Sequence, residues 1–570
     1  MYADLVIKNG NICCGQETFE ALAVKDKKII AAGSRSQIKG YIGDKTVVID
    51  AEGNDVMPAF TDTHLHPVMA CMLYEKSGAY LYDCEREDGE EREAYIDRFM
   101  SIVKAFADKH SEHSVIRGTG WYPAAFTADP DGTPTRHDID RFISDKPVML
   151  RAFDGHSILV NTKALELAGV DENTPTPKGG EMPREENGYP TGLFAEMPGI
   201  DFITESVPGG DYTVEELKEG LMDFQNDYAL PNGVVTVFDA LMLPNSLQAY
   251  LQLAQDERFK LKVNASLYAD PRKGMEQFEA MIADKGKYDV EDKLIVNTVK
   301  FFIDGGPMGM LMAEPFEPEI LKMYGLPADY CGDSLWSREE LTEAVEKLSQ
   351  AGYQIHIHTI GDGAVKLALD AFENAERKGI KGNRNVITHI ENILPEDIKR
   401  MKDLDVIAAV QPAWGCDDSF NDMAVVPLLG AKRAYESYPY GELADAGVLI
   451  TCSSDFPVSP KLNPFQGIKT GVTRVLSKES EEYELFKNKP LGPPENPMKY
   501  AMKLETVLAG YTKNAAYQLF REDYAGELKE GMSADIMILD RRMSETDPID
   551  IEDIEIKYLI VDGELWDKRC

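Results

Sequence analysis

The chain has 570 residues, 43% of them hydrophobic, and its 98 acidic side chains against 60 basic ones give a formal net charge of −38. A surface with this charge repels nucleic acid and anionic membranes, so we expect a small-molecule substrate and neither of those partners. A homodimer is compatible with this composition. No run of about 18 apolar residues and no secretory leader pattern occurs, and the eight scattered cysteines include no C-x-x-C pair. The sequence therefore predicts a soluble, cytoplasmic protein with reduced thiols.

The two ends of the chain differ from its middle. Short β-rich runs joined by Gly and Asn turns occupy residues 3–12, 21–33 and 45–54, and similar runs return at 534–540 and 556–565. We expect residues 1–56 and 506–570 to form one small β-sandwich from both termini, with a last helix at the start of the second segment.

Between these ends, apolar β-rich runs alternate with amphipathic helical segments, as in repeated βα units. Thr213 and Ser337 each start such a helix with a hydroxyl and a Glu three residues later, which predicts a capping box. Eight strands with intervening helices indicate an α/β fold of the (β/α)8 TIM barrel type over residues 57–505, with an insertion at about 70–146. The predicted strands are 55–62, 146–152, 233–240, 294–304, 353–358, 385–390, 405–412 and 447–454.

The first of these strands ends in an acid and two imidazoles. In the stretch "FTDTHLHP", Asp62, His64 and His66 alternate along an extended chain, so their side chains project to one face. Two histidines at this spacing can bind one cation, although a short H-x-H also occurs by chance.

Further metal-binding residue types fall at the ends of later strands. His358, His389 and Asp455 end or follow three of them, and His356 lies deeper on the strand of His358 as its expected hydrogen-bonded neighbour. Because barrel enzymes collect reactive groups at the C-terminal strand ends, one shared metal site explains these positions together.

Lys300 is the least expected residue on these strands. Its neighbours Val299 and Phe301 are apolar and suit the outer helices, so Lys300 points into the barrel. A buried ammonium is costly, so this side chain either loses its proton or pairs with an acid, for which Asp304 and Glu196 are candidates. A neutral amine reacts with carbon dioxide, and the resulting lysine carbamate can bridge two divalent ions.

Taken together, the stretches "MPAFTDTHLHP", "VKFFIDGG", "HIHTIGDGAV", "VITHIENILPEDI", "SSDFPV" and "ELKEGMSADIMILD" resemble the amidohydrolase superfamily. The branch is that of the YtcJ-like proteins and the N-substituted formamide deformylases. The chain departs from the branch pattern at Ala59, where a glycine is usual, and at Thr388, where a glutamate is usual.

The resemblance implies a metal-dependent barrel with a flanking β-sandwich. It also implies that His64 and His66 bind one metal, that carboxylated Lys300 bridges two, and that His358 and His389 hold the second. Asp455 would be both a ligand and the general base. Whether one or two ions are retained, and whether Glu196 contributes, stays open.

This ligand set predicts hydrolysis of a C–N bond, amide or formamide-like, with zinc activating a water molecule. Asp455 then accepts the proton of that water, and Lys300 and His358 complete the catalytic set. Alternatives are a deaminase of a cyclic amidine and a non-catalytic metal-binding barrel. Candidate substrate-binding residues at loops and strand ends are Trp121, His156, Met308 and Trp414.

Overall fold

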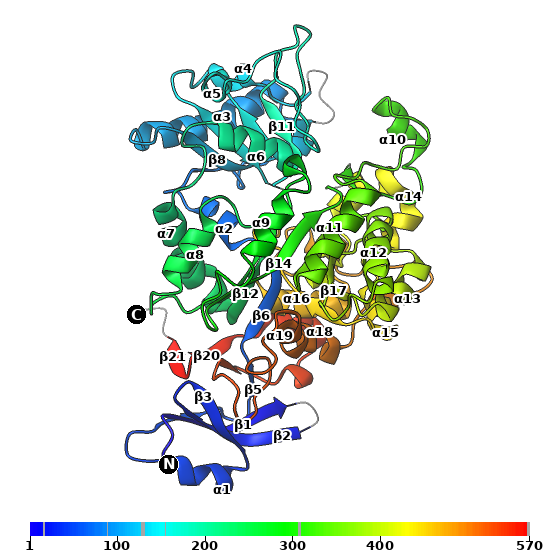
Figure 1. Cartoon of the computed structure of the whole chain (residues 1–570). Helices are drawn as coiled ribbons and strands as arrows, with labels where there is room; N and C mark the ends of the chain where they lie inside the picture. The colour runs from blue at the N-terminus through cyan, green and yellow to red at the C-terminus, as the bar shows by residue number, and fades with distance from the viewer. Residues whose placement is uncertain (15–16, 88, 127–131, 154, 306–308, 567–570) are drawn as a thin grey trace.

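The computed structural model describes residues 1–14, 17–87, 89–126, 132–153, 155–305 and 309–566. Figure 1 shows three parts: a sheet containing both chain ends, a central barrel, and a lobe above the barrel in this view. No helix in these ranges is both long and apolar enough to cross a membrane.

Strands from both termini form one sheet, as the sequence predicts. Its order is β21-β20-β19-β5-β1-β2-β3, with β4 paired to β1, and its core contains side chains from both ends of the chain, among them Ile7, Val56 and Ile538. The strands are β1 Leu5–Cys14, β2 Glu17–Lys25, β3 Lys28–Gly33, β4 Val47–Asp50, β5 Asp55–Pro58, β19 Ile536–Leu539, β20 Ile556–Val561 and β21 Glu564–Trp566.

Eight parallel strands form the barrel, in the order β18-β17-β16-β15-β14-β13-β12-β6. They are β6 Phe60–Leu65, β12 Val234–Asp239, β13 Lys262–Tyr268, β14 Leu294–Phe302, β15 Gln354–Thr359, β16 Val386–His389, β17 Ile407–Val410 and β18 Ile450–Cys452. The hydroxyl of Thr63 in β6 donates to the carbonyl oxygen of Cys452 in β18 at 3.0 Å. The Asp455 amide donates to the His64 carbonyl oxygen at 2.9 Å. These bonds bring the first and last strands together, so the predicted (β/α)8 barrel is confirmed.

One of the eight predicted strands is wrong. Residues 148–152 form β9 Val148–Ala152, which belongs to a separate five-stranded sheet, and the missed barrel strand is β13. The reason is that β13 places polar Lys262, Asn264 and Ser266 at alternate buried positions, so it lacks the apolar run by which strands are recognised.

The separate sheet forms a lobe, which is inserted between β6 and β12. The insertion therefore extends beyond residue 146, where its predicted end lies. Its order is β11-β10-β9-β8-β7, and α3 Arg92–Lys109 packs on it. Its other strands are β7 Ala79–Tyr80, β8 Ile116–Trp121, β10 Ser157–Val160 and β11 Leu193–Ala195, and α6 Glu196–Ser206 follows β11 directly.

Two outer helices begin where the sequence predicts. Thr213 and Ser337 each form the expected capping box, at the starts of α7 Val214–Phe224 and α11 Arg338–Gln350. Other barrel helices are α2 Pro67–Ala70, α8 Ser246–Leu253, α9 Gln277–Ala283, α12 Asp362–Arg377, α13 Pro395–Asp403, α14 Val426–Tyr435, α15 Tyr440–Asp445, α16 Pro464–Thr473, α18 Leu504–Tyr511 and α19 Lys513–Gln518.

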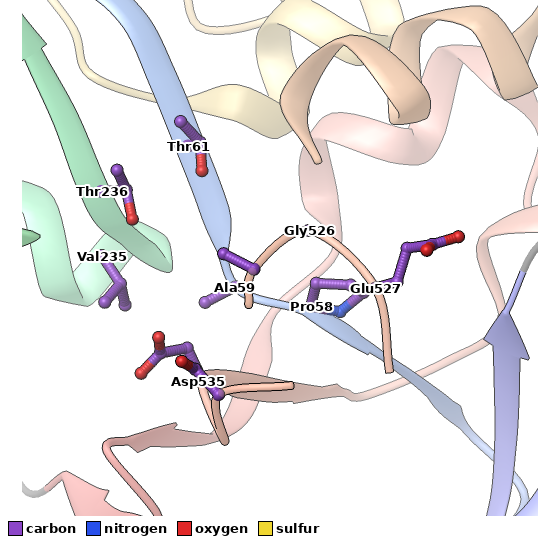
Figure 2. A pocket seen from close by; sticks show the side chains of 10 residues that line it. Pro58, Ala59, Thr61, Val235, Thr236, Gly526, Glu527 and Asp535 are labelled. Carbon is purple, nitrogen blue, oxygen red and sulfur yellow. The ribbon is translucent and has the colours of Figure 1, made fainter. Parts of the chain in front are cut away.

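Figure 2 shows a pocket at the N-terminal ends of the barrel strands. Ala59 and Val235, at the starts of β6 and β12, line it together with Gly526, Glu527 and Asp535 from the segment that leads into β19. Histidines at the C-terminal strand ends lie at the other end of the barrel, so this pocket is distinct from the site described next.

Candidate metal centre

Three of the predicted ligands lie together at the C-terminal end of the barrel. Nε2 of His66 lies 3.1 Å from Oδ1 of Asp455, and Nε2 of His64 lies 3.4 Å from the same oxygen. All three side chains are buried, and their ligand atoms lie within 4.8 Å of one another. His64 ends β6, His66 follows it, and Asp455 follows β18, so the closure of the barrel creates this cluster.

The donor atoms of this cluster fit a divalent ion. Nε2 of His64 and Oδ1 of Asp455 are buried and have no hydrogen-bond partner, although polar atoms in a protein interior normally have one. Zinc at 2.0–2.1 Å from each of its ligands separates tetrahedral donors by about 3.3 Å. The separations around Asp455 match this value. An ion held between these atoms would therefore satisfy them, and the nitrogen and oxygen donor set suits zinc.

His64 is oriented from behind by a second histidine. Its Nδ1 lies 2.8 Å from Nε2 of His356, which is itself buried and stacks on Phe238. With the proton on Nδ1, the Nε2 atom of His64 faces Asp455 with its lone pair. Asp62 fixes the backbone nearby, since it accepts from the amides of His64 and Ser454. Burial raises the pKa of Asp62 to about 7.

His358 and His389 lie beside this cluster and form a second pair. Their ring centroids are 4.6 Å apart, and the His389 ring is 4.9 Å from that of His64. Nδ1 of His358 lies 3.0 Å from Asp304, and Nδ1 of His389 lies 2.9 Å from Oε1 of Gln411. Each ring therefore has an orienting partner, as metal-binding histidines commonly do. Burial lowers the pKa of both rings well below the usual range, which keeps them neutral.

Two of these residues have a strained backbone. His389 has φ 72° and Asp455 has φ 58°, in the left-handed region that side chains other than glycine rarely adopt. Such a conformation costs on the order of 1–3 kcal/mol and occurs often at functional sites. Here His389 is the last residue of β16, and Asp455 lies three residues after the end of β18.

Lys300 points into the barrel from β14. It is fully buried, its Nζ has no hydrogen-bond partner, and it lies 4.7 Å from the Phe302 ring centroid. Phe301 contacts Trp336 on the outer side of the strand. Among the described residues, Lys300 forms no ion pair with Asp304 or Glu196, which pair with histidines instead. Burial lowers the pKa of Lys300 to about 7.

The four candidate substrate-binding residues have different surroundings. The Trp414 ring stacks on His389 at 5.3 Å and 5°, and the His156 ring lies 6.1 Å from that of His358. Trp121 is buried in the apolar core of the lobe, where its indole donates to Leu150, so its position favours packing over substrate contact. Met308 lies outside the described residues.

Sequence reasoning missed Gln411 as the partner of His389. The side chain also donates to Ser453 at 2.9 Å, so it links the ends of β17 and β18. The sequence does contain a signal for Gln411, because this polar residue directly follows the apolar run "VIAAV". His389 was predicted from the same kind of position, at the end of an apolar strand. Thr388, the departure from the branch pattern, bonds to the Ala409 carbonyl oxygen at 3.0 Å.

A parallel eight-stranded barrel with buried histidines and an aspartate at its C-terminal strand ends is typical of metal-dependent hydrolases. The family model described as "Amidohydrolase family" matches residues 47–566. The chain belongs to this family, as the sequence motifs predict.

The sequences and structures of several other proteins align with nearly the whole length of this chain. Protein LONG AFTER FAR-RED 3 of Arabidopsis thaliana is 30% identical, over 94% of this chain and 87% of its own. The N-substituted formamide deformylase of Arthrobacter pascens is 25% identical, over 99% and 98% of the two chains. The structure of an uncharacterized metal-dependent hydrolase from Pyrococcus horikoshii superimposes with a TM-score of 0.70 at 23% identity, covering 99% of this chain and 100% of the other.

Proposed function

We propose that this protein hydrolyses a C–N bond, amide or formamide-like, in a small-molecule substrate at a zinc-dependent site. The observation that carries the proposal is the buried cluster of His64, His66 and Asp455, in which Nε2 of His64 and Oδ1 of Asp455 lie 3.4 Å apart without a hydrogen bond. The name of the Arthrobacter pascens relative supports the formamide-like class.

A divalent ion held by His64, His66 and Asp455 would lower the pKa of a bound water towards 7 and polarise the carbonyl of the substrate. Asp455 then accepts a proton from the attacking water, because its carboxylate is the acid–base group within this cluster. It returns that proton to the departing nitrogen, so the bond breaks with a neutral amine as the leaving group. His358 and His389 lie on the adjacent side and can hold a second ion.

Lys300 completes the site in this proposal. An inward amine with a pKa of about 7 is substantially neutral at neutral pH, which is the form that reacts with carbon dioxide. The carbamate would place two oxygens that share one negative charge among the histidines, where they could act as metal ligands. The Nζ atom of Lys300 has no hydrogen-bond partner among the described residues, so it is not held in a competing contact.

A substrate panel tests the proposal. Protein loaded with zinc is assayed with N-formyl amines, N-acyl amines, cyclic amides and cyclic amidines, with formate, amine and ammonia measured separately. Formate or carboxylate release that is lost in His64→Ala supports the proposal. Release of ammonia from the amidines alone would favour a deaminase, and no turnover of any member with a full metal complement would favour a non-catalytic barrel.

A further inference from the structure

Two polar side chains of the lobe lie over the candidate metal centre. Nδ1 of His156 lies 3.1 Å from Oε2 of Glu196, and the Glu196 amide donates to the His156 carbonyl oxygen at 2.8 Å. His156 precedes β10 and Glu196 begins α6, so both come from the lobe and not from a barrel strand. The His156 ring lies 6.1 Å from that of His358, which places the pair directly beside the proposed ligands.

Two glycines after β14, Gly305 and Gly309, leave space for the Glu196 carboxylate because they have no side chain. A Cβ added to Gly305 would lie 2.5 Å from Oε1 of Glu196, and one added to Gly309 would lie 3.2 Å from it. Both glycines follow the strand that carries Lys300, so Glu196 reaches the mouth of the barrel between the lobe and β14. Glu196 itself has φ 57°, a left-handed conformation that turns its side chain in this direction.

The surroundings of Glu196 are acidic. Burial, followed by the charges of Glu196 and Asp333, raises the pKa of Glu181 above its usual value. Asp304 lies on the barrel side, close enough for the charge of Glu196 to act on it. Within the described ranges, no lysine or arginine forms an ion pair with Glu196, and the imidazole of His156 contacts its carboxylate. The Glu196 side chain is 21% exposed, so a ligand can reach it.

We propose that Glu196 binds an ammonium or other N–H donor on the nitrogen substituent of the substrate, and that His156 orients its carboxylate. The proposal rests on the function proposed above, because the pair is placed by its distance to His358, 6.1 Å between ring centroids. A substrate held at the metal would then extend its amine-side chain towards Glu196. A carboxylate that no described lysine or arginine neutralises favours a cationic group over a neutral one of equal size.

A matched pair of ligands tests this inference. N-(4-aminobutyl)formamide carries an ammonium where N-pentylformamide carries a methyl group, and the two have the same length. Binding is measured by calorimetry to zinc-loaded protein with Asp455→Asn, so that neither ligand is consumed. We expect the cationic ligand to bind at least about tenfold more tightly, the range of a charged hydrogen bond, and Glu196→Gln to reduce this preference to within about twofold.

Two further variants keep the test decisive. Glu166→Gln removes one exposed acid of the lobe and should leave the preference intact, which controls for net charge. If Glu196→Gln fails to fold, Gly305→Ala displaces the carboxylate and should lower the preference in the same way, since Gly305 does not have a positive φ.

The outcomes separate this inference from the proposed function. No preference in the protein with Glu196 intact, or a preference unchanged by Glu196→Gln, overturns the inference even when both formamides are hydrolysed. Loss of zinc from Glu196→Gln also overturns it, because Glu196 would then be a metal ligand. A preference that depends on Glu196 without turnover of either formamide supports the inference and counts against formamide hydrolysis.

Discussion

Nδ1 of His64 lies 2.8 Å from Nε2 of His356, a contact that joins the first barrel strand to the fifth across the interior. It determines which nitrogen of His64 faces Asp455. His356, which is not a proposed ligand, thereby orients a proposed ligand, as hydrogen-bond partners of metal-binding histidines commonly do.

His356→Phe should therefore weaken zinc binding by about 10–100-fold, the effect usual for loss of such a partner. Phenylalanine keeps an aromatic ring against Phe238, so packing is largely retained. Zinc affinity is measured by competition with a chromophoric chelator. His356→Gln, which retains a hydrogen-bonding group, should lose less zinc affinity than His356→Phe. An unchanged affinity in folded His356→Phe would show that the contact does not orient His64.

Asp455→Asn should lower kcat by at least about 100-fold, because asparagine keeps the shape of the side chain but cannot accept a proton. Zinc content should change much less, since the amide oxygen can still act as a weak ligand. Turnover, bound zinc and melting temperature are measured on one preparation. Near-normal turnover would remove Asp455 from the mechanism, and a loss confined to melting temperature would assign it a structural role.

His64→Ala should lose bound zinc and activity together, because one of the three clustered donors is removed. Chelator treatment of the unaltered protein should have the same effect, with recovery when zinc is returned. Elemental analysis and turnover follow both experiments. The matched control is His137→Ala, which removes an exposed histidine of the lobe. A metal-free protein with full activity would contradict the assignment.

Lys300 should carry a carbamate in protein equilibrated with ¹³C-labelled carbon dioxide, detected as a carbonyl signal that Lys300→Ala lacks. The reason is its buried position and a pKa lowered to about 7. Lys300→Ala should lose most activity, with partial recovery on addition of short carboxylates. A plain amine paired with an acid, in protein prepared with carbon dioxide present, would count against this assignment.

The buried carboxyl group of Asp239, in the strand next to that of His64, predicts a pH dependence of stability. Burial raises its pKa from 3.8 to about 7, and Tyr250 donates to it at 2.7 Å. The folded protein then holds a proton that the unfolded chain releases above about pH 4. Its contribution is therefore fully present below pH 4 and is lost as the pH rises to about 7, with a slope of at most about 1.4 kcal/mol per pH unit.

Asp239→Asn should remove this contribution, so the free energy of unfolding should fall less between pH 4 and 7 than in the unaltered protein. Denaturant unfolding at several pH values measures it. Asn232→Ala, at a position without a titrating side chain, is the control. Parallel curves for Asp239→Asn and the unaltered protein would show that Asp239 titrates alike in both states.

The barrel class and the residues of the candidate centre could be predicted from the sequence. Alternation along an extended chain places His64 and His66 on one face of their strand, whatever surrounds them. In the strand of Lys300, the apolar residues on one face indicate that the opposite face, with Lys300, points into the barrel. The capping boxes at Thr213 and Ser337 are likewise local, and both form as predicted. These features depend on the backbone geometry of single elements, which a sequence records directly.

The grouping of strands into sheets and the pairing of buried side chains could not be predicted from the sequence. Residues 148–152 make as good a strand in the lobe as in the barrel, and β13 was missed because its buried face is polar. The bonds of His356 to His64 and Gln411 to His389 join residues 292 and 22 positions apart. No local pattern encodes such pairs, because barrel closure and the position of the lobe bring them together.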